Sequence, residues 1–400
     1  MPDRQRADVV VVGGGVIGMA IAWRARQRGM SVTLLERDAA GGGTSRVAAG
    51  MLAPVGEVEF GETGRRLLEL GLRSSQMWPG FASDLQASTG VSVGLLQTGT
   101  LLVARDDDEA RELERQLAFR RSLGVEVARL RASEAREREP ALAPTLRLAL
   151  EAAADHSVDP RLVLMALRRA CACEGVALRE RAHVVRVELD DAGERATGVW
   201  LQDGERVDGA QLVLAAGPWS EQIDGLPARA GVPVRPVKGQ ILRLRDPAGP
   251  GLLRRVVRFS GGYVVPREDG RYVLGATVEE RGFELAPTAG GVYQLLREAH
   301  ELLPGICELE IEELSVGLRP GTPDNLPVIG RAGVDGLIWA TGHYRNGILL
   351  APLTAELVVA ALASDGGRVD ASPPPDGGVP LAQLLTACAP ERFAAAGAPA

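Results

Sequence analysis

The chain has 400 residues and is 46% hydrophobic, which is enough for two domains or for one large domain with an insertion. The net charge of −7 argues against a general nucleic-acid surface, and the longest apolar stretch, 348–363, is too short and interrupted to span a membrane. The four cysteines and four histidines lack zinc-ligand spacing, so we expect no metal site and reduced thiols in a cytoplasmic protein. The N-terminus does not have the pattern of a signal peptide.

Residues 8–37 have the pattern of a dinucleotide-binding βαβ unit. The β-branched run 9–12 predicts a strand buried on both faces of a parallel sheet. Gly13, Gly15 and Gly18 follow at the G-x-G-x-x-G spacing, which permits a tight turn, a close backbone approach to a pyrophosphate and close packing of the next helix. The alternative is a purely structural glycine turn in an α/β core. We favour the binding unit because strand, glycines and helix occur in the required order.

The second strand of this unit, expected over 32–35, ends in an acid. Glu36 stands where the ribose hydroxyls of a dinucleotide need an acceptor, and its charge would repel a 2′-phosphate. The following segment, 39–51, is rich in small residues and has Thr44 and Ser45 just before a possible helix start. Its amides and hydroxyls are suited to a phosphate or a ring edge, but a flexible loop with a capping residue explains it equally well.

Two kinds of pattern alternate along the middle of the chain. The hydrophobic period is two from 232 to 278, with hairpin signals at 261–262 and 269–270, which predicts an antiparallel sheet and hence a second domain. Apolar strands over 212–216 and 337–341 end beside a glycine, as the first strand does, and indicate returns to the nucleotide-binding sheet. Helices are expected at 67–85, 107–123, 133–137, 160–174 and 292–303, and further strands at 100–104, 184–189 and 198–202.

The last apolar unit favours a flavin over NAD. After Gly342, a helix that starts near Asn346 would present free backbone amides and a positive dipole end. A reduced flavin carries negative charge on N1 and the C2 oxygen and needs such a site, whereas NAD does not. The Asn-Gly pair would ordinarily suggest a hairpin, but the helical run after it makes an N-cap the better interpretation.

We therefore predict an α/β fold in which a Rossmann-like FAD-binding domain is interleaved with an α+β substrate domain built on an antiparallel sheet. The FAD-binding domain is assigned to 1–85, 155–225 and 315–365, the substrate domain to 86–154 and 226–314, and a C-terminal tail to 366–400.

From about 9 to 393 the chain resembles the glycine oxidases of thiamin biosynthesis, in the D-amino-acid-oxidase-like group of flavoenzymes. The segments that carry the resemblance are 10–18, 48–52, 236–240, 263–267, 275–277, 317–322 and, most specific, 343–352. The resemblance implies non-covalent FAD, hydride transfer from a small amino acid to flavin N5, and reduction of O2 to hydrogen peroxide. The product imine would hydrolyse to glyoxylate or pass to a thiazole synthase. We expect glycine, sarcosine and small D-amino acids as substrates, no nucleic-acid or membrane partner, and a homo-oligomer.

The resemblance also implies roles for individual residues. Arg319 would clamp the substrate carboxylate, Tyr263 would hydrogen-bond it, and Arg345 would lie beside substrate and flavin. The alternatives are a structural ion pair for Arg319 and an ordinary strand residue for Tyr263. For His343 we favour packing or a backbone hydrogen bond over catalysis. The residues expected to hold FAD are Gly13, Gly15, Val16, Ile17, Gly18, Glu36, Arg37, Thr44, Ser45, Ala49, Gly50, Met51, Val184, Gly217, His343, Tyr344, Arg345, Asn346, Gly347, Ile348 and Leu349.

Several residues leave the function partly open. The chain has Arg46, Gly261 and Val278 where relatives carry other residues, and a place for the last two in the pocket would leave substrate size in doubt. Lys238 is the only lysine. It is either a cation near the flavin that favours reaction with oxygen or, as we prefer, a buried amine that satisfies strand or loop carbonyls. The main alternative function is a D-amino-acid, sarcosine or proline oxidase or dehydrogenase of the same fold.

Overall fold

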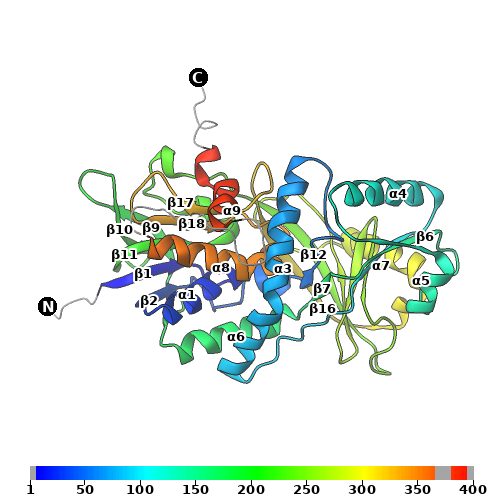
Figure 1. Ribbon diagram of the computed structural model, residues 1–400. Coiled ribbons are helices and arrows are strands. Elements are labelled where there is room, and N and C mark those ends of the chain that lie inside the picture. The colour runs from blue at the N-terminus through cyan, green and yellow to red at the C-terminus, as the bar shows by residue number, and fades with distance from the viewer. Residues whose placement is uncertain (1–5, 365–379, 394–400) are drawn as a thin grey trace.

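The structure, a computed structural model, describes residues 6–364 and 380–393 (Figure 1). It contains two sheets of eight strands each, which lie side by side along the long direction of the molecule. This arrangement confirms the predicted α/β fold with a second, antiparallel sheet.

The first sheet has the strand order β17-β18-β11-β1-β2-β8, with β10 and β9 attached at β11. β1 is parallel to both β2 and β11, and β18 is parallel to β11. Val9 and Val11 pack on one face of the sheet and Val10 and Val12 on the other, which explains why this strand is apolar throughout. The strands are β1 (Ala7–Val12), β2 (Val32–Leu35), β8 (Ala177–Arg179), β9 (Val184–Leu189), β10 (Ala196–Leu201), β11 (Arg206–Leu214), β17 (Val328–Arg331) and β18 (Leu337–Thr341).

Four helices pack with one face of this sheet into a continuous hydrophobic core. The core surrounds α8, whose sequence is therefore apolar on all sides. Gly18 is where α1 meets β1, because a Cβ on this residue would lie 1.9 Å from the Gly13 carbonyl oxygen. The helices are α1 (Val16–Gln27), α3 (Glu62–Thr89), α6 (Pro160–Cys173) and α8 (Gly347–Ala363).

The second sheet has the order β16-β12-β15-β14-β13-β4-β6-β5 and is antiparallel except where β13 meets β4. Its strands are β4 (Thr100–Ala104), β5 (Ala128–Arg131), β6 (Leu148–Ala152), β12 (Arg235–Arg245), β13 (Val256–Phe259), β14 (Gly262–Pro266), β15 (Arg271–Gly275) and β16 (Glu310–Gly321). The helices of this lobe are α4 (Asp107–Ser122), α5 (Ala132–Arg138) and α7 (Ala289–Leu302).

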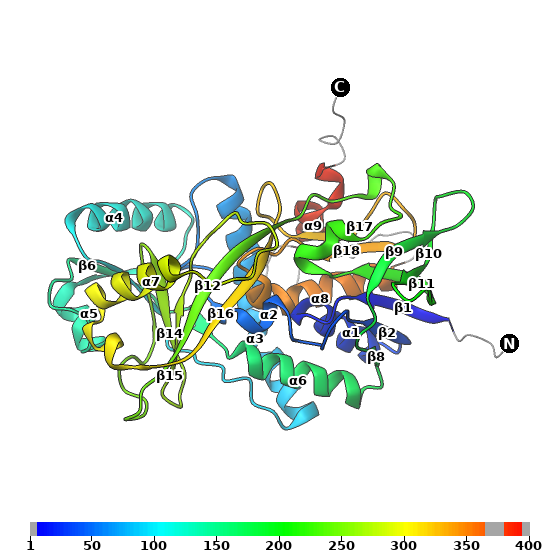
Figure 2. The ribbon, with the colours of Figure 1, turned by 180° about the vertical axis from the view of Figure 1, so that it is seen from behind.

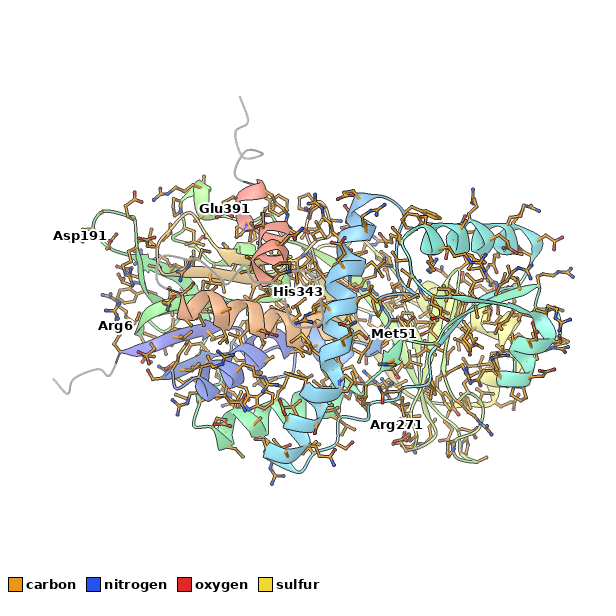
Figure 3. All side chains as sticks on the ribbon, in the orientation of Figure 1. Arg6, Met51, Asp191, Arg271, His343 and Glu391 are labelled. Carbon is orange, nitrogen blue, oxygen red and sulfur yellow. The ribbon has the colours of Figure 1, made fainter. Side chains whose placement is uncertain are left out.

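The long strands β12 and β16 lie at the junction of the two lobes (Figure 2). They contact the short helix α2 (Thr44–Val47) and the 3-10 helix η1 (Gly217–Gln222) of the first lobe. Close by, β3 (Met51–Leu52) pairs with β7 (His156–Ser157). Met51 and His343 lie near the middle of the molecule, whereas Asp191 is at the far end of the first sheet (Figure 3). The junction is therefore where segments distant in sequence meet.

The domain boundaries stay a proposal, and one of them cuts an element. β16 runs through the boundary proposed at 315, because its pairing with β12 continues to Gly321. The remaining short elements are the 3-10 helices η2 (Ala228–Ala230), η3 (Pro304–Glu308) and η5 (Pro390–Phe393) and the helix α9 (Leu381–Cys388).

Two expectations about helices need correction. The helix expected over 67–85 spans Glu62–Thr89, because its polar first turn shows no hydrophobic period and its end is set by Gly90, at φ 73°. The proposed tail also contains α9, which buries Leu384 and Cys388 near β17. The other parts of that tail, 366–379 and 394–400, lie outside the described residues.

Candidate active site

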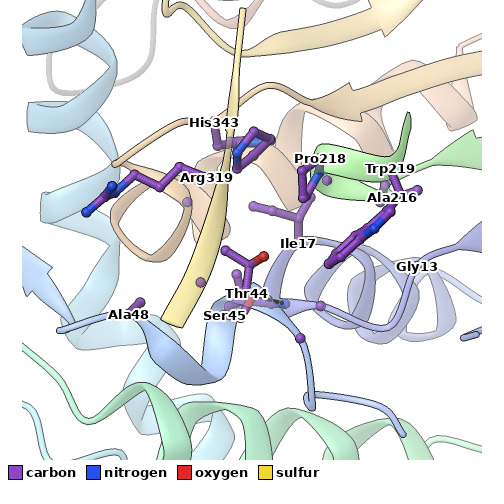
Figure 4. Close-up of a pocket in the computed structure, with 18 of the residues that line it drawn as sticks. Gly13, Ile17, Thr44, Ser45, Ala48, Ala216, Pro218, Trp219, Arg319 and His343 are labelled. Atoms are coloured by element: carbon purple, nitrogen blue, oxygen red, sulfur yellow. Dashed lines mark hydrogen bonds between the residues drawn. The ribbon is translucent and has the colours of Figure 1, made fainter. Parts of the chain in front are cut away.

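A cavity of about 550 Å³ lies between the two lobes (Figure 4). Its wall includes the carboxyl ends of β1 and β11, most of the segment 36–51, the middle of β12, the carboxyl-terminal part of β16, and the start of α8. Arg319 and Trp219 lie on opposite sides of the pocket in Figure 4. The cavity lies at the carboxyl ends of parallel strands, the usual ligand position in such sheets.

The glycine-rich end of the cavity is built for close backbone approach. Gly13 has φ 108°, and a Cβ on it would lie 2.4 Å from the Ala215 carbonyl oxygen. One carboxylate oxygen of Glu36 accepts a hydrogen bond from the Gly14 amide at 2.6 Å, and the other accepts from the Asp38 amide at 2.9 Å. Glu36 thus holds the loop and still presents acceptor lone pairs to the cavity that it lines.

Thr44 and Ser45 lie inside α2, not just before it, because Gly43 is the N-cap. The Ser45 hydroxyl accepts from the Val16 amide at 3.1 Å, and the Thr44 hydroxyl donates to the Leu318 carbonyl at 2.8 Å. Both residues line the cavity, and the proton of the Ser45 hydroxyl is left to donate to a ligand.

The start of α8 forms the opposite wall. Its N-cap residue, Asn346, makes no side-chain cap hydrogen bond, and its first turn has no acid. The same is true of α1, whose N-cap is Gly15. The N-cap interpretation of the Asn-Gly pair is therefore right. The first amides of α8, and those of α1 after Val16, whose amide already donates to Ser45, are available to negative charge.

His343 is buried beside α8. Its Nε2 lies 2.9 Å from the Thr354 hydroxyl, and burial lowers the pKa of His343 to about 3. The imidazole is therefore neutral near pH 7, in keeping with the expected packing role, although its partner is a hydroxyl and not a backbone group.

Nearly all the residues expected to hold FAD line this one cavity. Gly18, Asn346 and Leu349 are not among the lining residues. Gly18 is instead in contact with the backbone of Gly13, and the other two line a small neighbouring pocket.

Arg319 is held at the cavity by backbone groups alone in the described part of the chain. One guanidinium nitrogen donates to the carbonyls of Lys238 at 3.3 Å and Thr277 at 3.1 Å, and the group lies over Gly239, where a Cβ would come within 2.5 Å. Among the described residues no acid forms an ion pair with it. The structural ion pair considered above is thus not observed, and the positive charge is available to an anionic ligand.

Tyr263 and Arg345 complete this end of the cavity. Tyr263 pairs with Gly275 across β14 and β15, and desolvation raises the pKa of Tyr263 above its usual value. The phenol is therefore protonated and able to donate. Arg345 forms an ion pair with Glu59, which fixes its guanidinium at the mouth of the cavity.

Glu57 is a lining residue that sequence reasoning missed. The turn that presents it is held by buried charges. The Asp155 carboxylate accepts from the amides of Val55 at 3.1 Å and Gly56 at 2.8 Å, while Arg120 donates to the carbonyls of the same two residues at 2.9 and 3.1 Å. No motif marks Glu57, because its position depends on partners 60 to 100 residues away along the chain.

The departures from the relatives lie outside the cavity wall. Arg46 is exposed, Val278 is 58% exposed, and neither they nor Gly261 are among the described residues that line the cavity. The carboxylate of Glu298 fills the space that a side chain on Gly261 would take. These residues therefore do not set substrate size directly. Lys238 is fully buried, and its Nζ donates to the Ala286 carbonyl at 2.6 Å, which supports the buried-amine interpretation.

The fold and the site are those of a flavin-dependent oxidoreductase. Residues 8–361 match the family described as "FAD dependent oxidoreductase", and the chain belongs to this family. Its cofactor is FAD, and the cavity fits that molecule, with glycines for close approach, uncapped helix ends for negative charge and Glu36 for the ribose.

Within this family, the chain is similar to glycine oxidases. The chain is 37% identical to "Glycine oxidase" of Geobacillus kaustophilus (strain HTA426) over 357 residues, 88% of this chain and 92% of the relative. The crystal structure of glycine oxidase from Geobacillus kaustophilus superposes with a TM-score of 0.83 and 35% identity, covering 92% of this chain and 97% of the other. The chain is also 36% identical to "Bifunctional protein ThiO/ThiG" of Synechocystis sp. (strain ATCC 27184 / PCC 6803 / Kazusa), covering 88% of this chain but only 51% of that protein.

None of the helices in 6–364 and 380–393 is both long and apolar enough to cross a membrane. Within the same residues no group of three or more metal-binding side chains comes together.

Proposed function

We propose that the protein is a glycine oxidase that deaminates glycine, sarcosine and small D-amino acids. The observation that carries this proposal is the Arg319 guanidinium, which faces the FAD cavity and, among the described residues, has only backbone carbonyls as partners. A planar guanidinium binds a carboxylate through two hydrogen bonds, and a site shielded from water strengthens that pair. The glycine oxidases of Geobacillus kaustophilus and of Bacillus subtilis, which is 31% identical, support the choice of substrate.

The chain's residues bind and orient the substrate. Arg319 holds the carboxylate, the protonated Tyr263 phenol donates a second hydrogen bond to it, and Arg345 closes the mouth of the cavity. Fixing the substrate at its carboxylate directs the α-carbon toward the cofactor and removes the entropic cost of alignment from the chemical step. The neutral imidazole of His343 is hydrogen-bonded to Thr354 of α8 and takes up no proton near pH 7. FAD, when bound, supplies the hydride acceptor, which O2 reoxidises with formation of hydrogen peroxide.

A substrate panel tests this proposal. Hydrogen peroxide production should be measured with glycine, sarcosine, D-alanine, D-phenylalanine and L-proline. We expect the first three to give the highest kcat/KM values. A clear preference for D-phenylalanine or L-proline would instead favour a D-amino-acid or proline oxidase of the same fold.

We further propose that the enzyme works in the cytoplasm as a homo-oligomer and passes its imine product to a thiazole synthase. The relatives named ThiO/ThiG support this hand-off, because they join a region like this chain to a second region of similar length. Light scattering of the purified protein tests the oligomer. Conversion of glycine to the thiazole product by the enzyme mixed with a thiazole synthase tests the transfer, with catalase present to remove hydrogen peroxide. Hydrolysis of all the released imine to free glyoxylate would contradict it.

A further inference from the structure

The segment 279–288 connects the end of β15 to α7 and carries exposed apolar side chains. Phe283 is 41% exposed and Leu285 is 53% exposed. Leu285 nevertheless lines the FAD cavity, although the segment belongs to the lobe of the second sheet. Cofactor binding would bury the apolar surface of this leucine, and that burial would stabilise the bound state.

The two ends of the segment are fixed to β12 by buried polar groups. The Lys238 ammonium donates to the Ala286 carbonyl at 2.6 Å and lies 3.7 Å from the Glu279 carboxylate and 3.6 Å from the Glu284 carboxylate. The Gln240 side chain accepts from the Thr288 amide at 2.8 Å and donates to Glu279 at 2.7 Å.

A lysine suits this position better than an arginine. Lys238 has no exposed side-chain surface and meets one carbonyl and two carboxylates. A compact ammonium on a flexible stem can be enclosed by such a set, whereas a planar guanidinium needs more room. This explains why the chain uses its single lysine here.

The middle of the segment reaches the other lobe. The ring of Phe283 stacks on Trp219 of η1 with 6.3 Å between centroids, and the Arg37 guanidinium lies 4.5 Å from the Trp219 ring centroid. Arg37 and Trp219 also line the FAD cavity. The segment thus reaches from β12 to Trp219, which in turn contacts Arg37, the residue after Glu36.

We propose that residues 279–288 form a clasp that retains FAD in its cavity, and that Lys238 is the positioning residue that holds this clasp. Leu285 and Phe283 close the cavity from the side of the second lobe. Lys238 holds these two side chains in position by its hydrogen bond to the Ala286 carbonyl. The proposal rests on FAD as cofactor, not on glycine as substrate.

FAD dissociation from the full-length holoenzyme tests the clasp. Release should be followed by the increase in flavin fluorescence after dilution of the holoenzyme into a large volume of FAD-free buffer. We expect Phe283→Ala, Leu285→Ala and Lys238→Met each to release FAD about tenfold faster. The matched control is Tyr293→Ala, which removes an exposed aromatic ring from α7 outside the cavity wall and should release FAD at the wild-type rate.

A double-mutant cycle separates positioning by Lys238 from a general effect on folding. If Lys238 acts through the clasp, Lys238→Met in the Phe283→Ala background should add little to the release rate. Fully additive effects, or wild-type release in Phe283→Ala and Leu285→Ala, would overturn the proposal. Slower reaction of reduced, FAD-saturated Lys238→Met with oxygen would also overturn it, and would assign the ammonium to oxygen chemistry.

Discussion

At the scale of single residues, the site depends on one arginine, Arg319, that has no acidic partner among the described residues. Arg319 is surrounded by carbonyls, which orient its guanidinium without neutralising it. The protein therefore has a cation ready for a carboxylate, at a place where an ion pair within the protein would have blocked binding.

Replacing Arg319 by alanine should remove this interaction. We expect kcat/KM for glycine to fall roughly 150-fold, because a shielded charge-assisted pair is lost. This corresponds to a loss of about 3 kcal/mol of transition-state binding. FAD content should stay normal. Arg46→Ala, which removes an exposed arginine from α2 in the first lobe, is the control and should match the wild type. An unchanged kcat/KM in Arg319→Ala would remove Arg319 from the substrate site.

The Glu57 carboxylate should strengthen the binding of ligands that carry an amine and weaken the binding of ligands that carry only a carboxylate, which it repels. In Glu57→Gln we expect the KM for glycine to rise several-fold and glycolate, observed through the flavin absorbance, to bind more tightly. Glu62→Gln, an exposed change at the start of α3, is the control. Equal weakening of both ligands would show that Glu57 only supports the local structure.

At the scale of elements, the start of α8 and the carboxyl ends of β1 and β11 supply one side of the cavity. The body of α8 is buried on all sides, so its uncapped first turn is held rigidly at the cavity. A buried hydrogen bond between His343 and Thr354 connects the segment just before α8 to the body of the helix.

The burial of His343 makes stability depend on pH. Because the pKa of His343 is about 3 in the folded protein and about 6.5 when unfolded, the unfolded chain takes up a proton first as pH falls. The contribution is present above pH 6.5 and is lost toward pH 3. From pH 7 to pH 5 this residue alone should cost about 2 kcal/mol of unfolding free energy.

Urea unfolding of FAD-saturated protein at these two pH values measures this effect. His343→Gln keeps a group that can reach Thr354 but cannot titrate, so its unfolding free energy should fall about 2 kcal/mol less than that of the wild type. Equal losses in both proteins would mean that His343 is not buried in its neutral form.

At the scale of the whole molecule, both lobes contribute to the cavity for FAD. The cavity wall combines β1, η1 and α8 of one lobe with β12, β16 and the clasp of the other. A ligand that binds only the assembled cavity stabilises both lobes together.

Removal of FAD should therefore destabilise the protein cooperatively. With FAD at about 100 times its Kd, we expect about 2.7 kcal/mol of added stability and a melting temperature that rises with FAD concentration. Differential scanning calorimetry of apoprotein with FAD or NAD measures this. The same rise with NAD would contradict the cofactor assignment.

Features with a local physical cause could be predicted from the sequence alone. The first βαβ unit, its glycines and Glu36 depend on neighbours within about 30 residues, where strand patterns and turn geometry act directly. The roles of Arg319 and Tyr263 came from a family resemblance, and both residues line the FAD cavity. Glu57, the partners of Lys238, the clasp and α9 were decided only by tertiary structure. Their positions follow from hydrogen bonds, charges and packing between segments far apart in the chain, and no local pattern encodes which distant carbonyl a buried ammonium will meet.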